Sequence, residues 1–163
     1  MKRLMIIFIG GAIFLLLFIF LFSPNFSRSY HHFLVKETNL SEEKVNGLKL
    51  GEKVNRKNLE RNRDVEEYDY YELRKGIEVA TDKSAATIVR FIVTNDEQET
   101  VRGVKIDDSK EKVIREYGEN YYTRLEQGLD IIGYVDKKNE TSIEFWLGND
   151  GVLMYRYDYQ FMK

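Results

Sequence analysis

Few residues in this chain could do chemistry. His31 and His32 are its two histidines, and it has no cysteine. Without further histidine or cysteine, the usual nucleophile–base pairs cannot be assembled. Adjacent residues on an extended strand point to opposite faces, so we do not expect these two histidines to chelate one metal. The sequence therefore predicts no catalytic residue, no metal site and no cofactor, and it favours a protein that is not an enzyme.

Carboxylates are plentiful, and they keep one enzymatic alternative open. They form two clusters: Glu66, Glu67 and Asp69, and Glu140 and Glu144. Either cluster could supply the acid pair of a cell-envelope enzyme acting on wall polymers. Asp107 and Asp108 precede a predicted helix, where capping explains them better than calcium does. The acidic run 95–99 lacks the spacing of a calcium loop. Most of these acids are therefore interpreted as solvated surface.

An uninterrupted apolar run, residues 4–22, opens the chain. Its 19 residues carry no charge, and as a helix they would span roughly 28 Å, close to the hydrocarbon thickness of a bilayer. Lys2 and Arg3 precede the run and predict a cytoplasmic N-terminus. A cleaved signal peptide is the competing interpretation, but its apolar core would be shorter. We therefore expect a signal-anchor in a single-pass cell-membrane protein whose C-terminal region is extracytoplasmic.

Length and charge limit what the rest of the chain, after the apolar segment, can be. The chain has 163 residues, and outside the apolar segment and its two preceding cations 23 basic residues face 27 acidic ones. This balance gives no reason to expect a nucleic-acid partner. With no cysteine, stability must come from a packed core, and the chain is long enough to build one. The sequence does not determine the oligomeric state.

Two stretches share the pattern V-x-G-aliphatic-Lys-aliphatic, at residues 45–50 and 101–106. Each alternates as a half-buried strand does. After the second, Asp108 is expected to cap a helix, with Glu111 completing a capping box and Gly118 ending it. After the first, a weaker helix is expected over residues 54–62, anchored by Val54 and Leu59 alone.

The following segments extend the repeat. Gly76 corresponds to Gly128 and Phe91 to Phe145, and Asn149-Asp150-Gly151 is a strong hairpin signal. The predicted fold class is α+β: an N-terminal transmembrane helix followed by two tandem helix-plus-antiparallel-β-meander units. The expected boundaries are 1–23 for the anchor, 24–30 for a juxtamembrane linker, 31–100 for the first unit and 101–163 for the second. A short strand is expected from His31 onward.

The helix-then-meander order, introduced by residues 103–118 and more loosely by residues 47–62, resembles the SmpA/OmlA (BamE-like) group and the β-lactamase-inhibitor-protein-like (BLIP-like) fold. Known members of this group bind other proteins, so the resemblance implies a protein-binding role here. It implies nothing about individual site residues.

Alternation along the strands divides them into two faces. Val89, Phe91 and Val93 are expected in the core, as are the odd-numbered residues from Leu153 to Phe161. Apolar residues beside charges then share the second face, as at binding surfaces. The candidate protein-binding residues are Arg90, Ile92, Glu144, Trp146, Met154 and Arg156. An equal alternative is that this face packs the two units together.

These patterns favour a membrane-anchored, extracytoplasmic module that binds another protein, as an assembly factor, an inhibitor or an immunity-type partner. Two alternatives stay open: the envelope enzyme with paired carboxylates, and an ectodomain that senses a small ligand between the repeats. A cytoplasmic tail of three residues is too short to signal alone, which disfavours the last.

Overall fold

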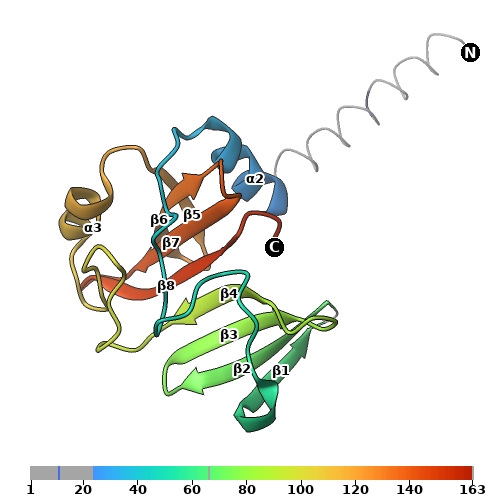
Figure 1. Ribbon diagram of the computed structural model, residues 1–163. Coiled ribbons are helices and arrows are strands. Elements are labelled where there is room, and N and C mark those ends of the chain that lie inside the picture. Colours follow the sequence, from blue (N-terminus) through green and yellow to red (C-terminus); the bar gives the residue numbers. More distant parts are fainter. Residues whose placement is uncertain (1–10, 12–23, 66, 163) are drawn as a thin grey trace, which may run out of the picture. The chain divides into compact units, whose positions relative to one another are not determined.

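The computed structural model describes residues 11, 24–65 and 67–162, and the chain divides into two compact units, Met1–Leu34 and Val35–Lys163. In the first unit the described element is helix α2 (Pro24–Leu34), shown in blue in Figure 1. Residues 24–30, expected as a linker, lie in this helix together with His31 and His32. The strand expected from His31 is therefore wrong: Tyr30, Phe33 and Leu34 recur at the spacing of a helix face.

The structure also corrects the prediction of a single-pass membrane protein. The predicted span, residues 4–22, lies outside the described residues except for Gly11. In the ranges that are described, no helix is both long and apolar enough to cross a membrane. Helix α2 has 11 residues and includes Arg28, whereas a span needs about 20 mostly apolar residues. This finding contradicts the predicted membrane anchor and the extracytoplasmic location that followed from it.

The second unit is built on one antiparallel sheet, whose eight described strands lie in the order β1-β2-β3-β4-β8-β7-β6-β5. They are β1 (Glu60–Val65), β2 (Tyr68–Arg74), β3 (Ile77–Asp82), β4 (Ile88–Val93), β5 (Tyr122–Glu126), β6 (Leu129–Asp136), β7 (Thr141–Leu147) and β8 (Val152–Tyr159). Strands β1–β4 form one meander and β5–β8 another, and the two meet where β4 pairs with β8 (Figure 1). A 3₁₀ helix, η1 (Arg56–Asn58), and helix α3 (Lys110–Tyr117) accompany the sheet.

This architecture contradicts the predicted fold class of a transmembrane helix with two tandem helix-plus-meander units. The helix expected over residues 54–62 is absent, because the chain passes from η1 directly into β1. Val54 and Leu59 supply too small an apolar stripe to hold a helix, whereas pairing with β2 satisfies the backbone of β1. The strand expected over 101–106 is a turn, in which the Thr100 N–H donates to the Val104 carbonyl at 2.8 Å.

The helix predicted after residue 108 is confirmed as α3, but its cap differs by one residue. Ser109 is the N-cap, and its hydroxyl oxygen accepts from the Lys112 N–H at 3.3 Å. Asp108 instead accepts from the Lys105 N–H at 2.7 Å and closes the preceding turn. Gly118 ends the helix with a φ of 91°, as predicted.

The hydrophobic core lies on one face of the sheet, the core face. Its fully buried members on the strands include Val79, Phe91, Ile132, Tyr134, Ile143, Phe145 and Tyr155. Helix α3 contributes Val113 and Tyr117 to the same cluster, and the segment before η1 contributes Leu40 and Val45. Tyr117 packs on Phe145 with ring centroids 5.2 Å apart. Helix α3, the segment before η1 and the segment before α3, which adds Val104 and Ile106, therefore cover the core face.

Two β-bulges shift the expected alternation. The register slips between Ala80 and Thr81 where β3 pairs with β4, so Ile88 joins the core cluster and Val89 packs with Ala80 on the other side. A second slip at the start of β8 buries Val152 and leaves Leu153 exposed. A bulge adds one residue to one strand, so each side chain beyond it changes face.

Candidate functional site

The six candidate binding residues share one sheet face, the second face, opposite the core. Their positions follow from the strand register: Arg90 pairs with Asp158, Ile92 and Glu144 with Arg156, and Trp146 with Met154. Strands β4, β8 and β7 are neighbours, so the six side chains form one patch across the seam between the two meanders. Alternation alone identified this grouping correctly.

Glu144 is the anionic centre of the patch. Its side chain is 0% exposed. It accepts from the Tyr122 hydroxyl at 2.5 Å and from Arg124 Nε and Nη2 at 2.8 and 3.1 Å. Arg156 also donates to it. Burial alone lowers the pKa of the Arg124 guanidinium, but the bonds to Glu144 and Glu126 outweigh burial and raise it.

Asp158 is the second anionic centre. Arg90 Nε and Nη2 lie 2.9 and 2.8 Å from its Oδ2. Ser142 donates to Oδ1 at 3.0 Å, and Arg156 Nε lies 3.3 Å from Oδ2. Arg156 therefore bridges Glu144 and Asp158, and its positive charge links β7 to β8.

Trp146 lies beneath the arginines of this network. The guanidinium carbons of Arg156 and Arg124 are 4.7 and 5.7 Å from the Trp146 ring. Both distances suit a cation–π contact. Trp146 is 5% exposed, so its ring is covered by other residues of the same chain.

Burial limits what this patch can offer to a partner. Arg90, Glu144 and Trp146 are buried, whereas Ile92, Met154 and Arg156 are half-buried. The protein-binding role of these six residues stays a prediction. The network also contains Asp158, which alternation placed on this face without making it a candidate, and Tyr122 and Arg124. The last two were missed because only the strand order places β5 beside β6 and two strands from β7.

The structure describes four of the five clustered carboxylates, Glu67, Asp69, Glu140 and Glu144. Glu66 lies outside the described residues. Asp69 accepts from Arg61 Nη2 at 2.5 Å, and Glu140 is exposed in the turn between β6 and β7. Within the described ranges, no group of three His, Cys, Asp or Glu side chains could hold a metal ion. Glu144 and Asp69 are engaged by arginines, which is the arrangement of structural ion pairs.

Strand β5 forms one edge of the sheet. The β5–β6 hairpin turns through Gln127 and Gly128, whose φ values of 53° and 82° fit a type I′ turn. In such a hairpin the flanking pair, Glu126 and Leu129, exchanges both backbone hydrogen bonds, and every second pair repeats the pattern. The N–H and C=O groups of Thr123 and Leu125 therefore point away from β6. Among the described residues these groups have no hydrogen-bond partner.

The opposite edge of the sheet, β1, is protected. Four of its six residues are charged, and its register shifts between Arg61 and Arg63. Charges and bulges are the usual protection of an edge strand. In contrast, β5 pairs with β6 without a register shift and carries Leu125, which is 70% exposed. The two edges therefore differ in their capacity to accept another strand.

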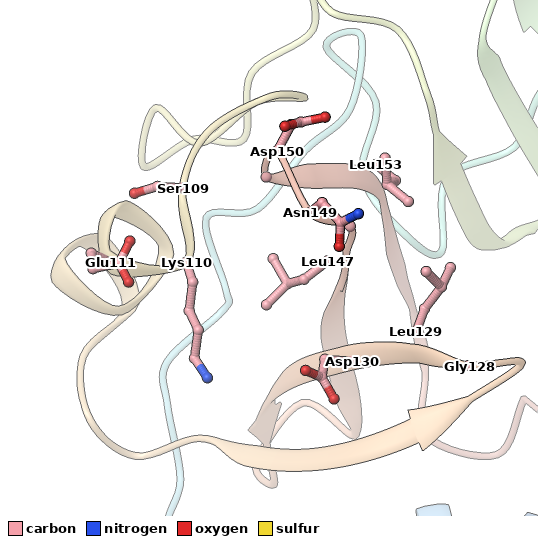
Figure 2. A pocket seen from close by; sticks show the side chains of 12 residues that line it. Ser109, Lys110, Glu111, Gly128, Leu129, Asp130, Leu147, Asn149, Asp150 and Leu153 are labelled. Carbon is pink, nitrogen blue, oxygen red and sulfur yellow. The ribbon is translucent and has the colours of Figure 1, made fainter.

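A pocket of about 610 Å³ lies beside the β5–β6 hairpin (Figure 2). Its lining comes from three places: the start of α3 (Ser109, Lys110, Glu111), the end of the hairpin (Gly128, Leu129, Asp130), and the β7–β8 turn with its flanks (Leu147 to Asp150, Gly151, Leu153). Three leucines give it apolar area, and Lys110, Glu111 and Asp130 give it both charge signs. Asp130 pairs with Leu125, so the pocket adjoins β5.

Comparison with known proteins found no matching family model, no matching curated protein and no matching solved structure.

Proposed function

We propose that this chain is a protein-binding module that accepts an extended strand at the free edge of β5. The observation that carries the proposal is the edge itself: four backbone groups with no hydrogen-bond partner among the described residues, beside an exposed leucine. Strand addition gains affinity from main-chain hydrogen bonds and specificity from pockets for alternate side chains.

The surroundings of β5 support this function. The Leu125 side chain is 70% exposed on this edge and offers apolar area to a strand added there. The four backbone groups belong to Thr123 and Leu125, whose side chains lie on the core-face side of the sheet. The BamE-like and BLIP-like resemblance, which implies protein binding, stays a prediction that agrees with this proposal.

The test is site-specific photo-crosslinking in cells with the full chain. A photo-reactive amino acid at position 123 is expected to give protein adducts. The same amino acid at Val65, on the protected edge β1 and 45% exposed, is the control and is expected to give none.

The backbone contribution is tested by Leu125→Pro against Leu125→Ala. The Leu125 N–H takes no part in β5–β6 pairing, so proline removes the edge donor and leaves the hairpin bonds in place. Adduct yield is expected to fall further with proline than with alanine. Equal yields from both variants, or equal adducts from positions 123 and 65, would overturn the proposal.

A further inference from the structure

We propose that residues 41–50, the strap, are a pH-sensitive cover of the core face, which opens locally when the Glu43 carboxylate is ionised. Within the strap, Val45 is buried in the core cluster, and Leu48 and Leu50 pack against that cluster. Opening of the strap therefore uncovers part of the apolar core face. It does not require a strand at the edge of β5.

Hydrogen bonds of the flanking residues fix both ends of the strap. Before it, the Leu40 N–H donates to Asp136 Oδ2 at 2.8 Å. Burial alone would raise the pKa of Asp136, but bonds from the Leu40 N–H and from Asn139 outweigh burial and lower it below 3.8, so this end stays fixed above that pH. After the strap, the Gly51 N–H donates to the Ile88 carbonyl at 2.9 Å. A segment fixed at both ends can open between them while the sheet stays folded.

Glu43 joins the middle of the strap to α3 and to the loop before it. Its Oε1 accepts from the Tyr117 hydroxyl at 2.7 Å, and its Oε2 accepts from the Val101 N–H at 3.3 Å. Glu43 is 4% exposed. When it is ionised, its carboxylate is a buried charge, which disfavours the closed strap unless the charge is fully paired.

Arg102 compensates this charge only in part. Its Nε lies 3.9 Å from Glu43 Oε1, which is too far for a hydrogen bond. Its Nη1 and Nη2 donate instead to the Glu116 and Asn39 carbonyls, at 3.2 and 2.7 Å. The guanidinium is therefore held by backbone oxygens, and the closed strap leaves the Glu43 charge without a direct ion pair to it.

The other titratable side chains around Glu43 keep their charge state over the relevant pH range. Burial raises the pKa of Tyr117, on α3, and those of Tyr155 and Tyr157, on β8, above the ordinary 10, so all three hydroxyls stay neutral. Glu42, the neighbour in sequence, is exposed. Among these groups, Glu43 is the one whose burial couples its charge to the closed strap.

The direction of the pH effect follows from burial. Burial raises the pKa of Glu43 in the closed strap above 4.5, whereas an opened strap returns the carboxyl to water. The closed state then binds the proton more tightly than the open state does. Opening therefore becomes more favourable as pH rises from about 4.5 through the raised pKa, and the gain ends above it.

A cavity of about 210 Å³ gives water a route to the carboxylate. Its lining comes from the strap and its start (Asn39, Leu40, Glu42, Glu43) and from the loop before α3 (Val101, Arg102). Water in this cavity adjoins the two residues whose charges are incompletely paired, so we expect opening to begin here.

The experiment measures thiol labelling of single-cysteine variants of the full chain, which has no native cysteine. Val45→Cys, at a position 2% exposed, reports opening of the strap, and Ile143→Cys, at a position 1% exposed on β7, reports unfolding of the sheet. Labelling by a dithiodipyridine, which reacts in mild acid, is followed from about pH 5 to about pH 8. Each rate is divided by that of the same variant in urea at the same pH.

The normalised rate at position 45 is expected to exceed that at position 143 at each pH. It should rise by up to about tenfold per pH unit until the raised pKa of Glu43 is passed. Adding Glu43→Gln to Val45→Cys should abolish this rise, whereas adding Glu42→Gln should leave it. Histidines titrate in the same range, but they would affect both double variants alike.

Equal normalised rates at positions 45 and 143 would mean that the strap opens only with the whole sheet, and they would overturn the proposal. The same rise with Glu43→Gln as with Glu42→Gln would also overturn it. If Val45→Cys does not fold, amide hydrogen exchange decides. The Val101 N–H should then lose protection with pH in the unsubstituted chain and keep it in Glu43→Gln, and equal behaviour of the two would count against the strap.

Discussion

Arg90 and Asp158 face each other across the seam between the two meanders, with Arg90 Nε and Nη2 2.9 and 2.8 Å from Asp158 Oδ2. The pair is directly opposed in the β4–β8 register, which covers four residue pairs. Both side chains are buried. This short seam therefore has a buried ion pair at one end, in which two guanidinium nitrogens contact one carboxylate oxygen, and Tyr70 accepts a further bond from Arg90 at 3.1 Å.

Removing one partner of this pair is expected to be costly. Asp158→Ala leaves Arg90 buried without its carboxylate, and breaking a buried pair in this way costs about 3–5 kcal/mol. The free energy of unfolding from urea titration measures the loss. The control is Glu97→Ala, which removes the exposed Arg74–Glu97 pair and should cost below about 1 kcal/mol. Similar losses for both variants would contradict the structural role of the seam pair.

Glu43 is expected to make stability depend on pH in the direction opposite to most carboxylates. Burial raises its pKa above the ordinary 4.5, although bonds from the Tyr117 hydroxyl and the Val101 N–H oppose the rise. A carboxyl whose pKa is raised in the folded state binds its proton more tightly there, so protonated Glu43 adds to the free energy of unfolding at low pH. This added stability is lost as pH rises from about 4.5 through the raised pKa.

Glu43→Gln should remove that loss, because glutamine keeps an oxygen that can accept from Tyr117 and carries no charge. Urea unfolding at several pH values measures the difference between variant and wild type. Glu42→Gln, on the exposed neighbour, is the control. If the free energy of unfolding depends on pH in the same way in Glu43→Gln and in wild type, burial of the Glu43 carboxyl does not cause that dependence.

Asp82 is expected to contribute stability that disappears in acid. The Ala85 N–H lowers its pKa to about 2, and burial opposes this while bonds from Ser84 and Thr87 add to it. Because the folded pKa lies below the ordinary 3.8, the contribution is present above that pH and is lost as pH falls towards about 2. Asp82→Asn should flatten the decline of thermal stability between those two pH values. An unchanged decline would show that the β3–β4 turn does not depend on this charge.

Gly133 is expected to tolerate no side chain, because the Tyr122 ring fills the space where its Cβ would lie. A Cβ at Gly133 would lie 2.2 Å from the Tyr122 ring, so the ring would have to move and lose its bond to Glu144. Overpacking of this kind costs typically about 1–3 kcal/mol. Gly133→Ala should therefore lower the free energy of unfolding, and it should cost much less in a Tyr122→Ala background. Additive effects of the two substitutions would mean that the contact is not the cause.

The sequence by itself determined much of the local structure. Period-two alternation placed Arg90, Glu144, Trp146 and Arg156 on one face. Gly118 set the end of α3, and Asn149-Asp150-Gly151 set the β7–β8 turn, where the Gly148 N–H donates to the Gly151 carbonyl at 2.8 Å. These features depend on residues close in sequence, so the residue types alone specify them.

Only the tertiary structure decided the pairing and the burial. The strand at 60–65 replaced the expected helix because β2 offers it a ladder, and the β-bulge beside Arg90 exchanged the faces of Ile88 and Val89. Trp146 is buried because the strand order sets Arg124 and Arg156 over its ring, from strands on both sides of β7. The open edge likewise exists only because β5 is last in that order. Strand order joins residues far apart in the chain, and no local pattern encodes it.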